Sequence, residues 1–147
     1  MKKLLLILVV GVLLLTACQA EEESVEAHDY WLRAAAQGEN SAMYLLLHNH
    51  ETTTDEFIGA SSEIAEAVEL HSSTVDANGV MQMSPVAAVE LLPDAEVYFE
   101  PGGLHVMFIG LKQDLQNGDE VQVTLHFRNH EDIVLTVPVQ EGPGEMH

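Results

Sequence analysis

The sequence predicts an all-β fold, a single-domain β-sandwich, and three observations support this prediction. Short apolar segments alternate with turn-forming residues along most of the chain. A sustained 3.6-residue apolar period, which would indicate helix, is missing apart from an ambiguous stretch at residues 61–70. The segment that follows residue 26 is about 115 residues long, enough for one domain with one core. It contains no cysteine for a disulfide or a thiolate zinc site, so its hydrophobic core must hold it together.

Nine segments are expected to form strands, because each is rich in apolar, β-branched or aromatic residues and lies between turn signals. In chain order these segments are His28 to Ala34, Ala42 to His48, Glu56 to Ala60, Ala67 to Val75, Val80 to Pro85, Val97 to Phe99, Leu104 to Ile109, Val121 to Arg128 and Ile133 to Val139.

The turns between these strands are expected at residues 37–41, 76–79, 101–103 and 117–119, where glycine, proline, asparagine and aspartate gather. The sharpest of these signals is Asn78 followed by Gly79, because both residues tolerate positive φ. The segments on either side of it should therefore pair as a hairpin. That hairpin would carry His71 on one arm and Met83 on the other.

The first 17 residues are typical of a secretory signal peptide, with two lysines followed by an apolar run from Leu4 to Leu15. This run is too short for a confident membrane-spanning helix. Residues 15–18, Leu-Thr-Ala-Cys, resemble a bacterial lipobox, in which the cysteine is acylated after cleavage. We expect Cys18 to be a lipid anchor that holds an exported protein on the extracytoplasmic face of a membrane, in a periplasm or at a cell surface. The alternative is an ordinary signal peptide with an incidental cysteine.

Acidic residues dominate the chain, with 24 Asp and Glu against five Lys and Arg and a formal net charge of −19. Such a surface would repel phosphate groups, so nucleic acid is not expected as a partner. We interpret the charge mainly as a solubility property that also attracts cations in general. Residues 18–26 are expected to form an acidic tether, residues 27–140 the domain, and residues 141–147 a flexible tail.

The sequence does not predict an enzyme, and no catalytic residue is assigned. It has no Gly-rich phosphate loop, no HExxH zinc signature and no recognisable serine or cysteine nucleophile pattern. Carboxylates are so abundant that no single pair of them is informative. We expect a monomeric binding protein.

Four residues stand out as soft or borderline metal ligands: His71, Met83, His105 and Met107. Side chains alternate between the two faces of a strand, so His105 and Met107 should project to the same side, about 6 to 7 Å apart. They can converge on one ion if other ligands come from a neighbouring segment. Thioether sulfur and imidazole nitrogen select a soft cation, and Cu(I) fits best. The simpler alternative is that each methionine fills the core and each histidine is hydrogen-bonded structure.

Several other residues are weaker candidates for the same ion. Met81 lies two residues before Met83 and shares its face of the predicted strand. Met146 and His147 end the chain after a Gly-Pro-Gly segment, and this short tail would assist copper capture only in a minor way.

Two histidine pairs lie outside this set. His48 and His50 flank one residue at the end of a predicted strand and would bind Cu(II) or Zn(II) weakly as a same-face pair. Solvated loop histidines are the simpler interpretation of this pair. His126 and His130 would lie roughly 13 Å apart on a strand, so they cannot chelate one ion together.

The spacing of the four ligands resembles a known family signature. His71 is followed by Ser72, ten residues, Met83, twenty-one residues, His105, Val106 and Met107. This order resembles the pattern His-(Met)-X10-Met-X21-His-X-Met of the periplasmic copper chaperone family PCu(A)C, also called DUF461. The resemblance covers nearly the whole mature domain and includes Trp31, Arg33, Met43, Tyr44, Asn49, Gly59 to Ser61, Glu69 to His71, Gly79 to Met83, Pro101 to Met107 and Gly110 to Leu115.

The resemblance implies a cupredoxin-like Greek-key β-sandwich that binds one Cu(I) as cargo near its surface, through the four ligands of the signature. Family members are associated with delivery of copper to the CuA centre of cytochrome c oxidase subunit II, often alongside Sco-type thiol proteins. This chain departs from the family at Ser72, the optional methionine position, and at Ser84, where a basic residue is common. The second departure and the acidic surface bear on partner contacts more than on the metal site.

Three alternatives stay open at this point. The first is a copper-sequestering or resistance lipoprotein with the same site but no dedicated acceptor. The second is a structural or adhesive sandwich domain in which Met83 and Met107 belong to the core. The third, an electron-transfer cupredoxin, is disfavoured because such sites normally use a cysteine thiolate.

Overall fold

The computed structural model describes residues 24–142, and this range contains ten strands. They are β1 (Val25–Arg33), β2 (Ser41–Asn49), β3 (Asp55–Ser61), β4 (Ala65–Val75), β5 (Met81–Pro85), β6 (Val89–Leu91), β7 (Glu96–Phe99), β8 (Leu104–Leu111), β9 (Glu120–Phe127) and β10 (Ile133–Gln140). No helix within these residues is long and apolar enough to cross a membrane. The predicted signal peptide, Cys18, Met146 and His147 lie outside the described residues.

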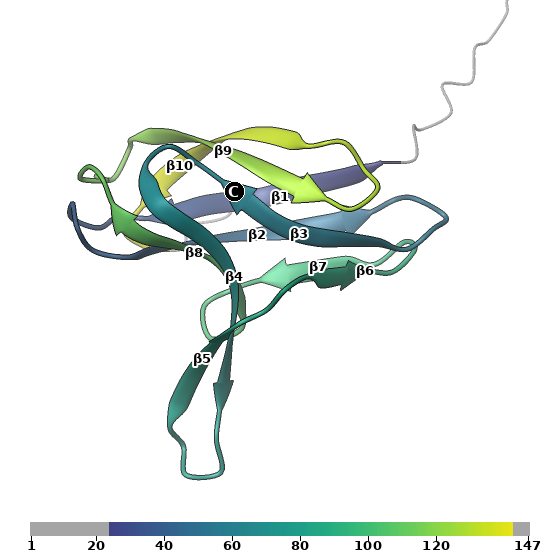
Figure 1. Ribbon diagram of the computed structural model, residues 1–147, viewed down its shortest axis with the longest axis horizontal. Coiled ribbons are helices and arrows are strands. Elements are labelled where there is room, and N and C mark those ends of the chain that lie inside the picture. Colours follow the sequence, from purple (N-terminus) through teal and green to yellow (C-terminus); the bar gives the residue numbers. More distant parts are fainter. Residues whose placement is uncertain (1–23, 143–147) are drawn as a thin grey trace, which may run out of the picture.

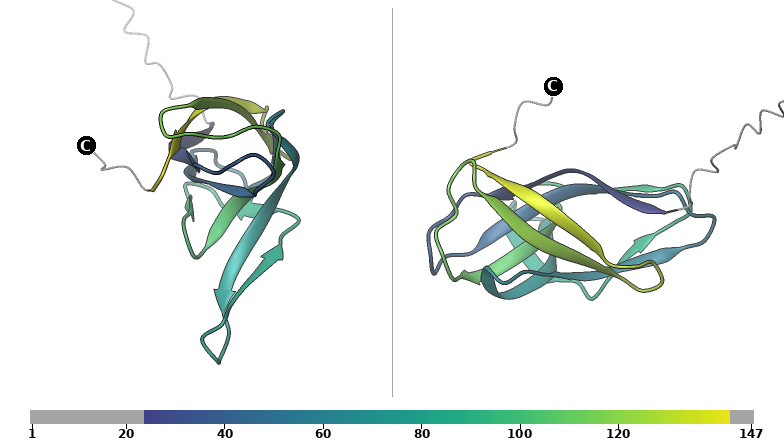
Figure 2. Two further views of the ribbon diagram at one scale, coloured as in Figure 1. Left: turned by 90° about the vertical axis from the view of Figure 1, so that its left-hand side faces the viewer. Right: turned by 90° about the horizontal axis from the view of Figure 1, so that it is seen from above.

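The strands form two layers that close around one core, which confirms the predicted all-β sandwich (Figures 1 and 2). Their order is β5-β4-β8-β7-β2-β1-β10-β9-β3-β6, with β8 also pairing with β2. The first six strands make one layer and the last four make the other. A short parallel pairing of β1 with β10, from Leu32 opposite Val139 to Arg33 opposite Gln140, joins the two layers at one edge.

The core forms where the inward faces of the two layers meet. Strand β9 shows the alternation that produces it: Val121, Val123 and Leu125 are buried, whereas Glu120 and Gln122 are exposed. At the centre of the core, the Phe57 ring packs edge-on against Phe99 and lies tilted on Phe127, with ring centroids 5.5 and 5.4 Å apart. The largest fully buried apolar side chains of both layers are Leu32, Met43, Leu47, Phe57, Leu91, Val106, Phe108, Val123, Leu125, Val137 and Val139.

All nine predicted strands are present, and the differences lie at their ends and in one short strand. Strand β6, which pairs with β3, was not predicted because it is only three residues long and has a glutamate at its centre. Strand β1 begins at Val25, inside the expected tether, because Val25 is buried and pairs with Asn49. The ambiguous stretch at residues 61–70 is a turn followed by the first half of β4.

Strands β4 and β5 extend beyond the sandwich as a two-stranded hairpin (Figure 1). Asp76 stabilises the turn between β4 and β5. One of its carboxylate oxygens accepts hydrogen bonds from the backbone N–H groups of Val80 and Asn78, at 3.0 and 2.9 Å. These bonds hold the pKa of Asp76 below its usual value. Gly79 adopts a φ of 80° in the turn, so the hairpin predicted from Asn78 and Gly79 is confirmed.

Asp55, at the start of β3, ties that strand to the loop between β9 and β10. Its buried carboxylate accepts hydrogen bonds from the backbone N–H groups of Glu56, Asn129 and His130, at 2.7, 3.0 and 2.8 Å. Burial alone would raise the pKa of Asp55, but these hydrogen bonds to the charged form outweigh it and the pKa lies below its usual value.

Asp55→Asn replaces one acceptor oxygen by an NH₂ group and leaves a partly buried backbone N–H without its acceptor. At pH 7 this should lower the free energy of unfolding by about 1–3 kcal/mol, measured by urea denaturation. Because the folded-state pKa is lowered, the contribution of Asp55 is present above the unfolded-state pKa of about 3.9 and is lost as the pH falls through the folded value. The difference between wild type and variant should therefore shrink in acid.

The control Glu131→Gln removes a carboxylate from the same loop at an exposed position. It should change the free energy of unfolding by less than about 0.5 kcal/mol. A deficit in Asp55→Asn that is equally large at pH 7 and at pH 3 would contradict the role given to the charged carboxylate.

Candidate metal centre

The four predicted ligands come from three adjacent strands and lie on one face of the sheet. His71 of β4 pairs directly with His105 of β8, and Met83 of β5 pairs with Ser73 of β4. Cross-strand partners share a face, and so do residues two apart along a strand. The register therefore places His71, Ser73, Met83, His105 and Met107 on the same side of the sheet.

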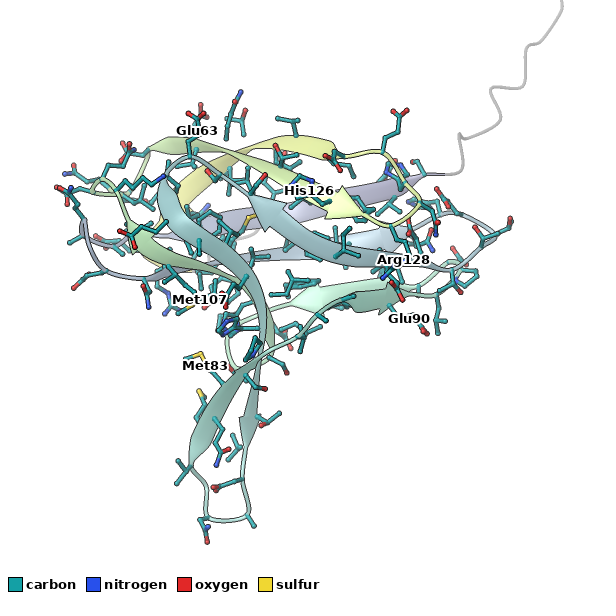
Figure 3. All side chains as sticks on the ribbon, viewed as in Figure 1. Glu63, Met83, Glu90, Met107, His126 and Arg128 are labelled. Carbon is teal, nitrogen blue, oxygen red and sulfur yellow. The ribbon has the colours of Figure 1, made fainter. Side chains whose placement is uncertain are left out.

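This face is hollowed into an open pocket of about 320 Å³ at the junction of the hairpin and the sandwich. Met83 at the base of the hairpin and Met107 on β8 lie on the same side of the molecule at this junction (Figure 3). His71 is not part of the pocket lining, but its ring centroid is 5.8 Å from that of His105. The lining is formed by Arg33, Asn40, Ser41, Ala42, Tyr44, Ser73, Met81, Met83, Pro101, Gly102, His105 and Met107.

His105 is held in a fixed orientation at the floor of this pocket. Only 4% of the residue is exposed, and its Nδ1 lies 3.1 Å from the carbonyl oxygen of Gly103. When Nδ1–H donates to this carbonyl, Nε2 carries the lone pair that a metal ion needs. The turn at residues 101–103, in which Gly102 has a φ of 87°, brings that carbonyl next to the ring.

His71 has a nitrogen that no protein group satisfies. Its Nε2 lies 2.9 Å from a carboxylate oxygen of Glu69, so Nε2–H donates to Glu69 and fixes the tautomer. The other nitrogen, Nδ1, is buried and has no hydrogen-bond partner among the described residues. Buried polar atoms are nearly always paired, and a histidine oriented by a carboxylate is a common arrangement for a metal ligand. The lone pair of this nitrogen is therefore available to a metal ion.

The thioethers differ from core methionines in their exposure. Met81 and Met83 are 56% and 57% exposed on the hairpin, whereas Met43 is completely buried in the core. Met107 is half-buried. A large apolar side chain left exposed beside a pocket does not contribute to core packing, so Met83 is not a core residue.

A small second cluster of apolar residues supports the pocket from below. The rings of Trp31 and Tyr44 pack with centroids 4.8 Å apart, next to Ala42. The guanidinium of Arg33 donates to the Tyr44 hydroxyl at 3.0 Å, and Tyr44 in turn lies 6.5 Å from the His105 ring. Burial raises the pKa of Tyr44, against the opposing effect of Arg33, so the phenol stays protonated. Trp31 lies on β1 and Tyr44 on β2, so the cluster forms only when these two strands pair. No local sequence pattern predicts that pairing.

His126 and His130 lie outside the pocket and make hydrogen-bond contacts with other residues. Nε2 of His126 lies 2.8 Å from the Ser61 hydroxyl and its Nδ1 lies 2.8 Å from Asp132, while Nδ1 of His130 contacts the carbonyl of Glu131 at 2.6 Å. The Ser-His-Asp order resembles a catalytic triad, but none of these residues lines the pocket. We interpret the network as a link between β3, β9 and the loop that follows β9.

The fold and the His/Met face together define a cupredoxin-like Greek-key β-sandwich of the PCuAC type. Residues 25–139 match the family described as "Putative lipoprotein LpqE-like", and the chain belongs to this family.

Three similar proteins support this assignment. The "Putative lipoprotein Lxx21020" of Leifsonia xyli subsp. xyli (strain CTCB07) is 30% identical over 125 residues, which span 84% of this chain and 74% of the relative. The "Copper-bound PCuAC domain from PmoF2" superposes with a TM-score of 0.67 at 24% identity and covers 81% of this chain and 94% of that one. The solution structure of "CuI-DR1885" from Deinococcus radiodurans has a TM-score of 0.61 at 22% identity, with coverage of 86% and 83%. The predicted resemblance and the predicted fold are confirmed.

Proposed function

We propose that this protein is an extracytoplasmic copper chaperone that binds one Cu(I) through His71, Met83, His105 and Met107. The observation that carries the proposal is the buried, unpartnered Nδ1 of His71 beside the His105 ring, on the sheet face that holds the thioethers. Two proteins of this fold, the "Copper-bound PCuAC domain from PmoF2" and "CuI-DR1885", carry copper.

The chemistry of the donor set favours Cu(I). Two neutral imidazoles and two thioethers are soft or borderline donors, and the described residues include no thiolate. A pocket that is open to solvent, with a ligand on a projecting hairpin, lets a ligand of the acceptor approach before the donor ligands leave. Cu(I) would then pass by ligand exchange and never be released into solution. Cu(II) is expected to bind only weakly at this donor set.

The acceptor that we propose is the CuA site of cytochrome c oxidase subunit II, reached directly or through a Sco-type thiol protein. This step rests on what is associated with the PCu(A)C family. We also propose that residues 1–17 are removed as a signal peptide and that acylated Cys18 keeps a monomeric carrier on the extracytoplasmic face of a membrane, where a membrane-bound acceptor is within reach.

Met83→Ala should weaken Cu(I) binding by at least about tenfold, since even groups that only orient a metal ligand contribute 10- to 100-fold to affinity. Its thermal unfolding without metal should match wild type, because Met83 is exposed. The measurement is anaerobic competition for Cu(I) against a chromophoric chelator. It uses the full chain in detergent, with Cys18→Ser in every variant so that the thiol does not compete.

The matched control is Met43→Ala. Met43 is completely buried, so its loss should cost about 2–5 kcal/mol of stability while the folded fraction keeps its affinity for Cu(I). The reverse result, in which Met83→Ala destabilises the protein and leaves Cu(I) binding intact, would contradict the proposal and favour a structural role for Met83.

Delivery is tested with the Cu(I)-loaded protein and a soluble CuA domain of an oxidase, mixed anaerobically with and without a reduced Sco-type protein. We expect the CuA domain to gain copper in at least one of the two mixtures. Retention of all copper by the donor in both mixtures would sink the delivery step and favour the sequestering alternative.

A further inference from the structure

A second cluster of ligand-bearing side chains lies at the other end of the same sheet. It consists of His28 and Glu26 on β1, His48 on β2, His50 just after β2, and Asp94 in the turn before β7. Strand β2 connects the two regions, because Tyr44 lines the copper pocket and His50 follows six residues later. At about 3.3 Å per residue the two sites are roughly 20 Å apart, so they cannot share an ion.

The backbone around this cluster is held in place by a buried side chain. Asn49 is completely buried, and its Nδ2 donates to the carbonyl oxygens of Leu91 and Thr53 at 2.9 and 3.0 Å, while its Oδ1 accepts from the N–H of Glu51 at 3.0 Å. The N–H of His50 itself donates to the carbonyl of Ser24 at 2.9 Å. The positions of His48 and His50 are therefore set before any ligand binds, which lowers the cost of binding one.

The side chains of the cluster converge around His50. The rings of His48 and His50 have centroids 3.7 Å apart. One carboxylate oxygen of Glu26 lies 3.1 Å from Nε2 of His28 and 3.4 Å from Nε2 of His50, and Asp94 lies 3.5 Å from Nε2 of His48. Two sets of three ligand atoms have all members within 4.8 Å of one another. One set is Glu26, His28 and His50, the other is His48, His50 and Asp94, and His50 belongs to both.

We propose that this cluster binds one borderline divalent cation, Zn(II) or Cu(II), with His50 as the ligand common to both sets. Each set offers two imidazoles and one carboxylate, which is a ligand combination that Zn(II) accepts with one position left for water. Neither set contains sulfur, so the preference differs from that of the Cu(I) pocket. Ligands about 2.0–2.2 Å from an ion lie closer together than 4.8 Å, so the side chains must move inward, and those of His28, His50 and Asp94 are exposed enough to do so.

The plainer interpretation is a set of surface contacts between imidazoles and carboxylates. Three of the eight histidines of the chain gather here around only two carboxylates, and two of the rings lie against each other. A bound cation accounts for this excess of imidazole, because one ion takes two of these rings as ligands at once. The acidic charge of the chain also raises the local concentration of cations.

The test is a Zn(II) titration of the full chain against a chromophoric competitor, in detergent and with Cys18→Ser in every variant. We expect one equivalent of Zn(II) to bind and the affinity to fall at least about tenfold in His50→Gln. Binding should be unchanged in His126→Gln, a surface histidine outside the cluster, and in His71→Gln. Equal affinity in His50→Gln and wild type would overturn the proposal. So would a loss confined to His71→Gln, because it would place Zn(II) in the copper pocket.

Cu(II) provides an independent localisation, because it broadens the NMR signals of nearby nuclei. At substoichiometric Cu(II), we expect the imidazole signals of His28, His48 and His50 to disappear before that of His126. Earlier loss of the His71 and His105 signals would overturn the assignment. These outcomes are separate from those of the Cu(I) competition, so either site can fail while the other stands.

Discussion

The pairing of His71 on β4 with His105 on β8 is the constraint on which the proposed copper site depends. A slip of one residue in this register would turn His71 to the opposite face and separate the two imidazoles. The register is fixed from the other side of the sheet, where Leu70 pairs with Val106 and both are buried in the core. Core packing on one face therefore fixes the positions of the two histidines on the other. The site needs no disulfide to hold it.

The hairpin β4–β5 adds a ligand that the sandwich alone does not supply. Strand β4 continues past the body of the domain, and β5 returns along it to place the thioether of Met83 opposite Ser73. The arrangement leaves Met83 exposed, so it contributes little to stability, and in the proposed function it would leave a bound ion accessible to an acceptor. His105, in contrast to the exposed Met83, is buried, and the Gly103 carbonyl fixes its ring orientation. One rigid and one accessible ligand would suit the proposed carrier, which must both hold and release its cargo.

Local patterns in the sequence were sufficient to predict nine of the ten strands, the hairpin at Asn78 and Gly79, and the shared face of His105 and Met107, because alternation and turn chemistry act over a few residues. The common face of all four residues depends on the pairing of β4 with β5 and β8, which no local pattern specifies. The unpartnered nitrogen of His71 could not be predicted from local patterns. It depends on the contact of the other ring nitrogen with Glu69 and on the pairing of β4 with β8. The histidine cluster was only half predicted. His48 and His50 are neighbours in sequence, but Glu26 and His28 reach them through β1, and Asp94 through a distant turn.

The central claim is that two imidazoles and two thioethers bind one Cu(I). X-ray absorption at the copper edge tests it most directly, on the full chain carrying Cys18→Ser and loaded anaerobically with one equivalent of Cu(I). Two nitrogen and two sulfur scatterers in the first shell, with one sulfur lost in Met83→Ala, are the predicted result. A first shell without sulfur, or one that Met83→Ala leaves unchanged, would contradict the account.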